Sequence, residues 1–202
     1  MEHIRISKSG GTNEWSANVG QVALDMLEKK GLDVKTKESV LSQSIDILES
    51  CGNPRNSVNN DTGLIIGYVQ SGKTLSFTTL SALAAQNGFN VIVVIAGTTT
   101  SLVEQTHNRL LEDLEINVST EVSWKTYKNP TKESRNEIIA DLKPGLLNNN
   151  PVVLITVMKN SSHLKNLNTL FGIGFDRDLC KVLIIDDEAD QASLNTKASK
   201  KF

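Results

Sequence analysis

Residues 64–74 contain the stretch that decides the fold, a short apolar run leading into a glycine-containing loop: Leu-Ile-Ile-Gly-Tyr-Val-Gln-Ser-Gly-Lys-Thr. Its last eight residues match the phosphate-binding loop pattern, in which two glycines separated by four residues precede lysine and threonine. Glycines let the backbone bend so that N–H groups face a phosphate, and the positive end of the following helix adds to the attraction. The stretch predicts an α/β nucleotide-binding protein.

The residues of this loop have separate expected roles. Lys73 is expected to reach the β- and γ-phosphates of ATP, and the Thr74 hydroxyl to join the shell of a magnesium ion. Apolar residues 64–66 fit a strand before the loop, and residues 75–85 fit a helix after it. The alternative is a glycine turn with a chance lysine, and the flanking strand and helix argue against it. The predicted ATP contacts are Gly67, Tyr68, Val69, Gln70, Ser71, Gly72, Lys73 and Thr74.

A second candidate motif lies near the other end of the sequence. The apolar run Val-Leu-Ile-Ile at 182–185 predicts a buried strand, and Asp-Asp-Glu-Ala-Asp follows at 186–190. Ligands of open α/β sheets gather at the carboxyl ends of strands. Asp187 is therefore expected to hold magnesium, directly or through water, and Glu188 to orient or deprotonate the attacking water. Asp186 is the rival for the metal role, and an acidic helix N-terminus is the simpler alternative.

Three stretches together resemble one known family. They are the phosphate loop, Thr-Val-Met-Lys-Asn at 156–160, and Ile-Asp-Asp-Glu-Ala-Asp-Gln-Ala-Ser at 185–193. They are similar to the Z-one domain family, whose members carry an endonuclease label, and residues 187–190 also resemble the signature of superfamily-two helicases. The resemblance spans about residues 61–196 and is most specific at the two nucleotide motifs.

The resemblance implies a RecA-like ATPase module of a bacterial or phage protein that acts on DNA, often in restriction or defence. It implies ATP and Mg²⁺ as cofactors, with Lys73 and Thr74 as phosphate and magnesium contacts. Asp187 is then the metal aspartate and Glu188 the catalytic carboxylate. The endonuclease label is not carried over, because the sequence shows no nuclease constellation to which it could be attached.

The apolar pattern predicts the architecture. Four core strands, 64–66, 90–96, 151–157 and 182–185, alternate with helical segments, which is typical of a parallel sheet covered by helices on both faces. Amphipathic helices are predicted at 14–29 and 37–51, and a strand at 118–124. The polar, turn-rich residues 52–63 suggest a boundary. We therefore expect an N-terminal helical extension at 1–60 and a RecA-like lobe at 61–202.

Two groups are candidate nucleic-acid contacts. Thr98, Thr99 and Thr100 follow the second predicted strand, where family relatives grip a nucleic-acid strand. The alternative, which can coexist with that contact, is an ordinary helix cap at Thr100 or Ser101. Lys159 follows the third strand and is a candidate for contacting nucleic acid, signalling between sites or capping the helix at 164–170. The net charge of −2 gives no global basic field, so DNA binding is expected to be local or shared with other parts of the protein.

Composition predicts a cytoplasmic protein. The chain has 202 residues and 39% hydrophobic content, enough for a full core. The longest apolar run, at 91–96, is far too short to span a bilayer, so no membrane partner is expected. Cys51 and Cys180 lack metal-ligand spacing, and the three histidines are isolated from acid or cysteine clusters.

The leading functional hypothesis is the ATPase lobe of a DNA-directed translocase or restriction-type enzyme. Helicase-like motors close two RecA-like lobes around ATP, and an arginine from the second lobe can be worth roughly 10³ to 10⁵ in turnover. No second lobe is recognised within these 202 residues, so we expect it from elsewhere or from a partner subunit, and weak hydrolysis without it. The alternatives are a protein-remodelling or signalling ATPase without nucleic acid, and a nonhydrolytic nucleotide-binding module.

Overall fold

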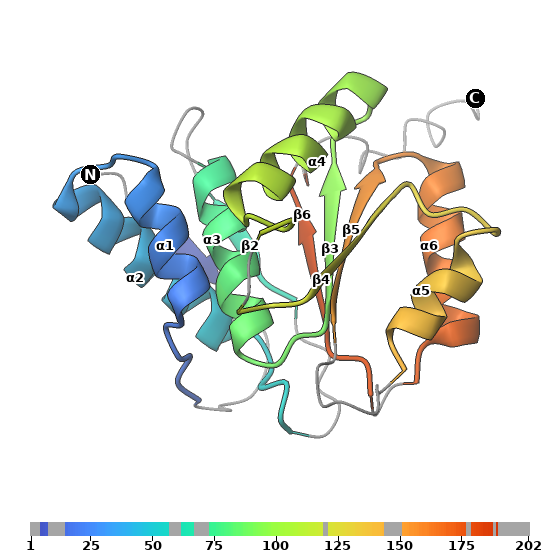
Figure 1. The fold of residues 1–202 in the computed structure, drawn as a ribbon, viewed down its shortest axis with the longest axis horizontal. Coiled ribbons are helices and arrows are strands. Elements are labelled where there is room, and N and C mark those ends of the chain that lie inside the picture. Colours follow the sequence, from blue (N-terminus) through green and yellow to red (C-terminus); the bar gives the residue numbers. More distant parts are fainter. Residues whose placement is uncertain are drawn as a thin grey trace, which may run out of the picture.

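A computed structural model describes residues 5–7, 15–56, 62–66, 73–118, 121–143, 151–176, 179–187 and 189. Its centre is a four-stranded sheet with the order β4-β5-β3-β6, in which every neighbouring pair is parallel (Figure 1). The strands are β3 (Val91–Ala96), β4 (Trp124–Lys128), β5 (Val152–Met158) and β6 (Val182–Asp186). The predicted α/β class with a parallel sheet is confirmed.

Both faces of the sheet are covered by helices. One face packs against α3 (Lys73–Gln86) and α4 (Thr100–Asp113), with α1 (Gln21–Lys29) and α2 (Val34–Ser50) outside α3. The other face packs against α5 (Arg135–Asp141) and α6 (Ser161–Gly174). Figure 1 shows this order of layers from α2 on one side to α6 on the other.

Strand alternation divides the core into two clusters. Successive side chains point to opposite faces of a strand. In β3, Ile92 and Val94 therefore join the cluster under α3 and α4, whereas Val91 and Val93 join the cluster under α5 and α6. All four are 0% exposed, which explains why this strand is a continuous apolar run in the sequence.

Helix α3 lies inside the molecule, between the sheet and the N-terminal helices. Three of its polar side chains, Thr78, Thr79 and Ser81, are 0% exposed. Each hydroxyl donates a hydrogen bond to the carbonyl oxygen four residues earlier, at 2.8 Å. Those bonds satisfy the buried hydroxyls. The sequence of α3 has no distinct polar face, and the helix can therefore pack against the sheet on one side and the N-terminal helices on the other.

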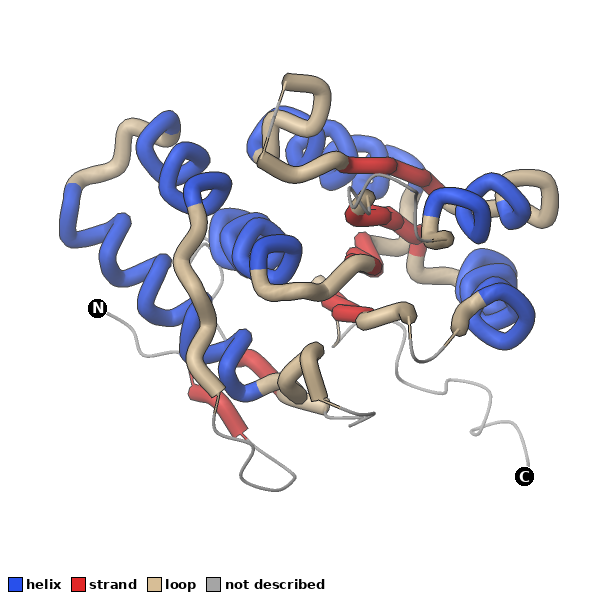
Figure 2. Tube along the Cα trace, turned by 60° about the horizontal axis from the view of Figure 1, so that its bottom comes forward, coloured by secondary structure: helices blue, strands red, loops and turns tan. Residues whose placement is uncertain are grey.

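The strand before the phosphate loop differs from its prediction. β2 (Leu64–Ile66) was expected in the parallel sheet, but it pairs antiparallel with β1 (Arg5–Ser7) in a separate two-stranded sheet. Figure 2 shows this pair apart from the parallel strands. The prediction of its partner was wrong because a three-residue strand offers few hydrogen bonds, so local pattern does not determine its neighbour. The strand predicted at 118–124 also lies later, starting at Trp124.

The N-terminal helices are confirmed with shifted bounds. α2 starts at Val34 because the Asp33 carboxylate caps it by accepting a hydrogen bond from the Thr36 N–H at 3.0 Å. Val22, Leu27 and Leu48 of α1 and α2 share one hydrophobic cluster with α3. The boundary predicted between residues 60 and 61 stays a prediction. Within the described residues, every helix is too short or too polar to traverse a lipid bilayer.

Asn87, just after α3, ties the segment before α1 to the core. Its side chain is 2% exposed and exchanges two hydrogen bonds with the Asn18 backbone, accepting from the N–H at 2.8 Å and donating to the carbonyl oxygen at 2.9 Å. A third bond runs from its amide to the Leu83 carbonyl at 2.8 Å. This one side chain therefore fixes where the N-terminal segment meets α3.

We predict that Asn87→Ala lowers the free energy of unfolding by about 1–3 kcal/mol, because the Asn18 backbone groups lose their partners. Urea unfolding followed by circular dichroism measures the change. The matched control is Asn108→Ala on the exposed side of α4, which should stay within about 0.5 kcal/mol of the parent protein. Equal stability of the two variants would contradict the prediction.

Candidate active site

The carboxyl ends of β3, β5 and β6 meet at one edge of the sheet. In the register, Ile95 lies opposite Asp186 and Ala96 opposite Met158. Backbone hydrogen bonds extend past the strands: the Asp187 N–H donates to the Ile95 carbonyl at 3.1 Å, and the Lys159 N–H donates to the Ala96 carbonyl at 3.2 Å. The end of β3 thus holds the segments that follow β5 and β6.

The start of α3 lies at the same edge. Only residues 87–90 connect α3 to β3, so the helix runs antiparallel to the strand (Figure 1). Fourteen helical residues span about 21 Å and the six residues of β3 about 20 Å, so the two elements match in length. Lys73, the first residue of α3, and the half-buried Thr74 therefore lie at the level of the strand ends.

Several predicted site residues lie outside the described residues. They are residues 67–72 of the loop before α3, residue Glu188, and the side chain of Lys73. Their predicted roles stay predictions: Gly67, Tyr68, Val69, Gln70, Ser71, Gly72, Lys73 and Glu188.

Strand alternation predicts different faces of the sheet for the two adjacent aspartates of the acidic motif. Asp186 lies four residues after Val182 in β6, so the two side chains point to the same face of the sheet. Val182 packs in the cluster under α5 and α6. Leu183 and Ile185 pack in the cluster under α3, and the same alternation, continued past β6, assigns Asp187 to that face. The alternation therefore predicts that the two rival carboxylates point to different sides of the sheet.

Asp186 forms an ion pair with Lys159. The Lys159 Nζ lies 3.0 Å from Oδ1 and 2.9 Å from Oδ2 of Asp186. The lysine residue is 8% exposed and the aspartate side chain 34%. The sequence analysis did not predict this pair, because its members are 27 residues apart and only the sheet topology brings them together.

Lys159 does not cap α6. That helix is capped by Asn160, whose Oδ1 accepts a hydrogen bond from the His163 N–H at 2.9 Å. Asparagine is a favoured N-cap residue, so this signal was present in the sequence. The predicted contact of Lys159 with nucleic acid stays a prediction, and its ammonium group is directed at Asp186.

The threonines after β3 lie at the same edge, at the start of α4. Thr98, Thr99 and Thr100 are exposed. Thr99 is the N-cap of α4, and its hydroxyl accepts a hydrogen bond from the Leu102 N–H at 3.3 Å. The helix cap was expected at Thr100 or Ser101, so that position was wrong by one or two residues.

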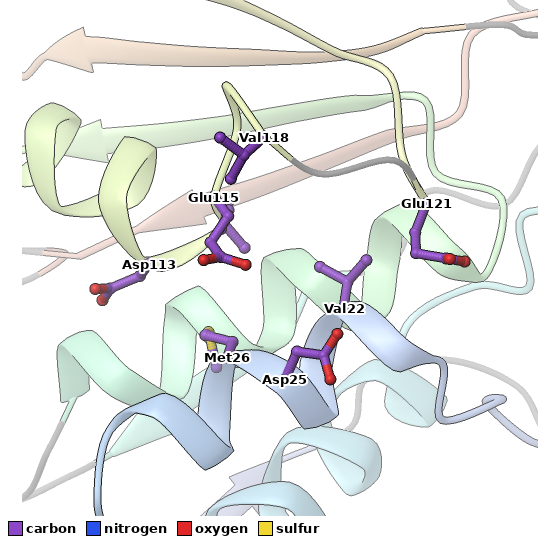
Figure 3. Close-up of a pocket in the computed structure, with 8 residues that line it drawn as sticks. Val22, Asp25, Met26, Asp113, Glu115, Val118 and Glu121 are labelled. Carbon is purple, nitrogen blue, oxygen red and sulfur yellow. The ribbon is translucent and has the colours of Figure 1, made fainter.

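A pocket between α1 and the far end of α4 is a poor candidate for nucleotide. Figure 3 shows four carboxylate side chains among the apolar residues that line it, and negative charges repel phosphates. Lys29 pairs with Glu115 and Lys30 with Asp113, so the nearby cations are already engaged. The lining residues are Val22, Asp25, Met26, Asp113, Leu114, Glu115, Val118 and Glu121.

Comparison with known families agrees with the architecture of this edge. Residues 34–200 match the family model described as type III restriction enzyme, res subunit. The chain belongs to this family. It is therefore a helicase-like ATPase of the restriction type, and its parallel sheet flanked by helices is the RecA-like domain expected from the sequence. No curated protein and no solved structure matches the chain.

His107 holds α4 against the sheet of this RecA-like domain. It is 9% exposed, and its Nδ1 lies 3.0 Å from the Thr156 hydroxyl of β5. Burial lowers the pKa of His107 below its usual value, and the positive charge of Lys128 lowers it further, against a smaller opposite effect of Glu104. The neutral imidazole is therefore the form that suits the folded protein.

We predict that His107 makes stability depend on pH. The unfolded chain binds this proton at about pH 6.5, whereas the folded protein binds it only at lower pH. The stability that neutral His107 provides is therefore complete above about pH 6.5 and is lost as pH falls below that value. For one proton, the free energy of unfolding changes by at most about 1.4 kcal/mol per pH unit. Thermal or urea unfolding between pH 5 and 8 measures this slope. An unchanged pH dependence in His107→Gln would contradict the assignment.

Proposed function

We propose that this chain is the ATP-binding and ATP-hydrolysing lobe of a DNA-directed, helicase-like ATPase in a restriction or defence system. The observation that carries the proposal is that the direction of α3 and the parallel register of β3 and β6 put the start of α3 and the end of β6 at the same edge of the sheet. On that edge, alternation assigns Asp187 to the face packed against α3. This arrangement supports a shared site for the two sequence motifs for nucleotide chemistry.

The donor chemistry of this edge fits Mg²⁺ and ATP. A threonine hydroxyl and a carboxylate are oxygen ligands, which magnesium prefers. Among the described residues, no group of three or more His, Cys, Asp or Glu side chains forms a metal cluster. A magnesium ion that takes most of its ligands from phosphate and water needs no such cluster. Thr74 and Asp187 are the residues proposed to hold it, and when bound it would neutralise negative charge on the phosphates.

The remaining roles follow from the two motifs. The loop Gly67–Thr74, a Walker A motif, is proposed to bind the phosphates, with Lys73 on the β- and γ-phosphates. Asp187 and Glu188 are proposed as the Walker B pair, in which Glu188 orients the attacking water and takes its proton. The pairing of Asp186 with Lys159 supports Asp187 over Asp186 as the metal aspartate.

DNA is the proposed partner in the full-length protein. The exposed hydroxyls of Thr98, Thr99 and Thr100 stand at the N-terminal end of α4, where backbone N–H groups and the helix dipole favour phosphate. A second RecA-like lobe or a partner subunit is proposed to supply the arginine that completes the site. The finer resemblance to the Z-one family also belongs to this proposal, without its endonuclease label.

A protein-remodelling or signalling ATPase is the second candidate. The net charge of −2 and the burial of Lys159 favour it, because both reduce the basic surface available to DNA. Dependence of turnover on nucleic acid separates the two functions.

We predict that DNA stimulates ATP hydrolysis by the native-length protein and that Lys73→Ala removes the stimulated turnover. Loss of a group that stabilises phosphate charge lowers turnover by about 10²–10³-fold. The measurement is phosphate release with no DNA, with single-stranded DNA and with double-stranded DNA. Fast turnover that ignores DNA would instead support the remodelling or signalling function.

We predict that Glu188→Gln keeps ATP binding but lowers turnover by at least about 10²-fold, because an amide cannot accept the proton of water. Filter binding with labelled ATP and single-turnover hydrolysis measure the two properties separately. Glu112→Gln, on an exposed position of α4, is the matched control and should behave as the parent protein. Unchanged hydrolysis in Glu188→Gln would remove this residue from the catalytic role.

A further inference from the structure

The Lys159–Asp186 ion pair crosses the end of the central strand. β5 and β6 lie on opposite sides of β3 and do not pair with each other. Lys159 directly follows β5, and Asp186 is the last residue of β6. The lysine side chain passes over the end of β3 to reach the aspartate. One ammonium group contacts both carboxylate oxygens, at 3.0 and 2.9 Å, which restricts how the carboxylate can turn.

Burial makes this pair unlike an ordinary surface ion pair. The lysine is only 8% exposed, so its charge has lost most of its water. The cost of removing a charge from water often cancels the attraction between buried partners, so such a pair is weak evidence for overall stability. What the pair does provide is a defined geometry, because both carboxylate oxygens lie within hydrogen-bond distance of one buried ammonium group.

The ion pair at Asp186 also restricts the position of the next residue, Asp187. Asp186 is the last residue of β6, and the following Asp187 N–H donates to the Ile95 carbonyl at 3.1 Å. The chain is thus held at two successive residues, by a side chain at 186 and by the backbone at 187. Leu183 and Ile185 pack on the α3 face, and successive residues of a strand face opposite sides, so we expect that fixing Asp186 toward Lys159 directs residue 187 toward the α3 face.

We propose that Lys159 and Asp186 are a positioning pair for the nucleotide site. Lys159 acts through Asp186 to hold Asp187 in the orientation that metal binding requires, and neither member of the pair contacts the nucleotide. This inference rests on the proposed function, since it concerns the same ATP site. It explains why two aspartates are adjacent in this motif: Asp186 anchors the strand end and Asp187 binds the metal.

The experiment is a double-mutant cycle of Lys159→Met, Asp186→Asn and the double variant. Affinity for a fluorescent ATP analogue is measured with Mg²⁺ and with EDTA, beside kcat and KM for ATP. Lys165→Met, on an exposed position of α6, and Asp46→Asn, on an exposed position of α2, are the matched controls. Thermal unfolding of every variant reports on folding.

The expected result is a loss confined to the magnesium-dependent part of binding. Each single variant should lose about 10–100-fold in magnesium-dependent affinity or in kcat, the range typical of residues that support metal ligands. Binding in EDTA should remain unchanged, because the phosphate loop is intact. The loss of affinity or kcat in the double variant should be no larger than the loss in the more impaired single variant, because the two residues act as one unit. A general structural defect would instead weaken binding in both conditions.

Three outcomes would overturn the positioning role. The first is normal magnesium-dependent binding and kcat in folded Lys159→Met or Asp186→Asn. The second is additive losses in the double variant. The third is loss of DNA binding in Lys159→Met alone with nucleotide binding intact, which would assign Lys159 to nucleic acid. Failure of the proposed function looks different: the parent protein would bind no ATP analogue, or Lys73→Ala would bind it equally well, and the positioning role would fall with it.

Discussion

The structure depends on the pairing of β3 with a parallel strand on each side. β3 joins β5 along six residue pairs and β6 along five, and five of its six residues are completely buried. A strand that is hydrogen-bonded on both edges and covered on both faces is the most constrained element a sheet can contain. Because all three strands run in the same direction, their ends, and the polar residues that follow them, are brought to one edge.

Hydrogen bonds satisfy several of the polar groups that are buried between the helices and the sheet. In α3, buried hydroxyls bond to carbonyl oxygens one turn earlier. Between α4 and β5, His107 and Thr156 satisfy each other. Such bonds matter because a buried polar group without a partner costs more than the bond itself contributes. The rigid layers on both faces give the strand ends fixed positions.

The two adjacent aspartates show how a strand end can separate two tasks. Asp186 pairs with Lys159, and strand alternation predicts that Asp187 points to the other side, toward α3. Two carboxylates one residue apart would otherwise compete for the same cation. In the proposed arrangement, Asp186 serves the structure of the edge and Asp187 serves the nucleotide chemistry.

The sequence by itself determined the class of the protein and its local elements. The runs at 91–96, 151–157 and 182–185 predicted three parallel strands because buried strands need apolar side chains on both faces. The phosphate-loop and acidic patterns pointed to a helicase-like ATPase because these motifs are short and local, and the family match agrees. Such features depend on residues close together along the chain.

Only the tertiary structure decided the partners that lie far apart along the chain. The pairing of β2 with β1, the bond between His107 and Thr156, and the ion pair between Lys159 and Asp186 all join residues separated by 27 or more positions. A lysine or aspartate has the same local signal whether it faces solvent or a buried partner. Its partner is set by strand order and register, which arise from packing of the whole core rather than from neighbouring residues.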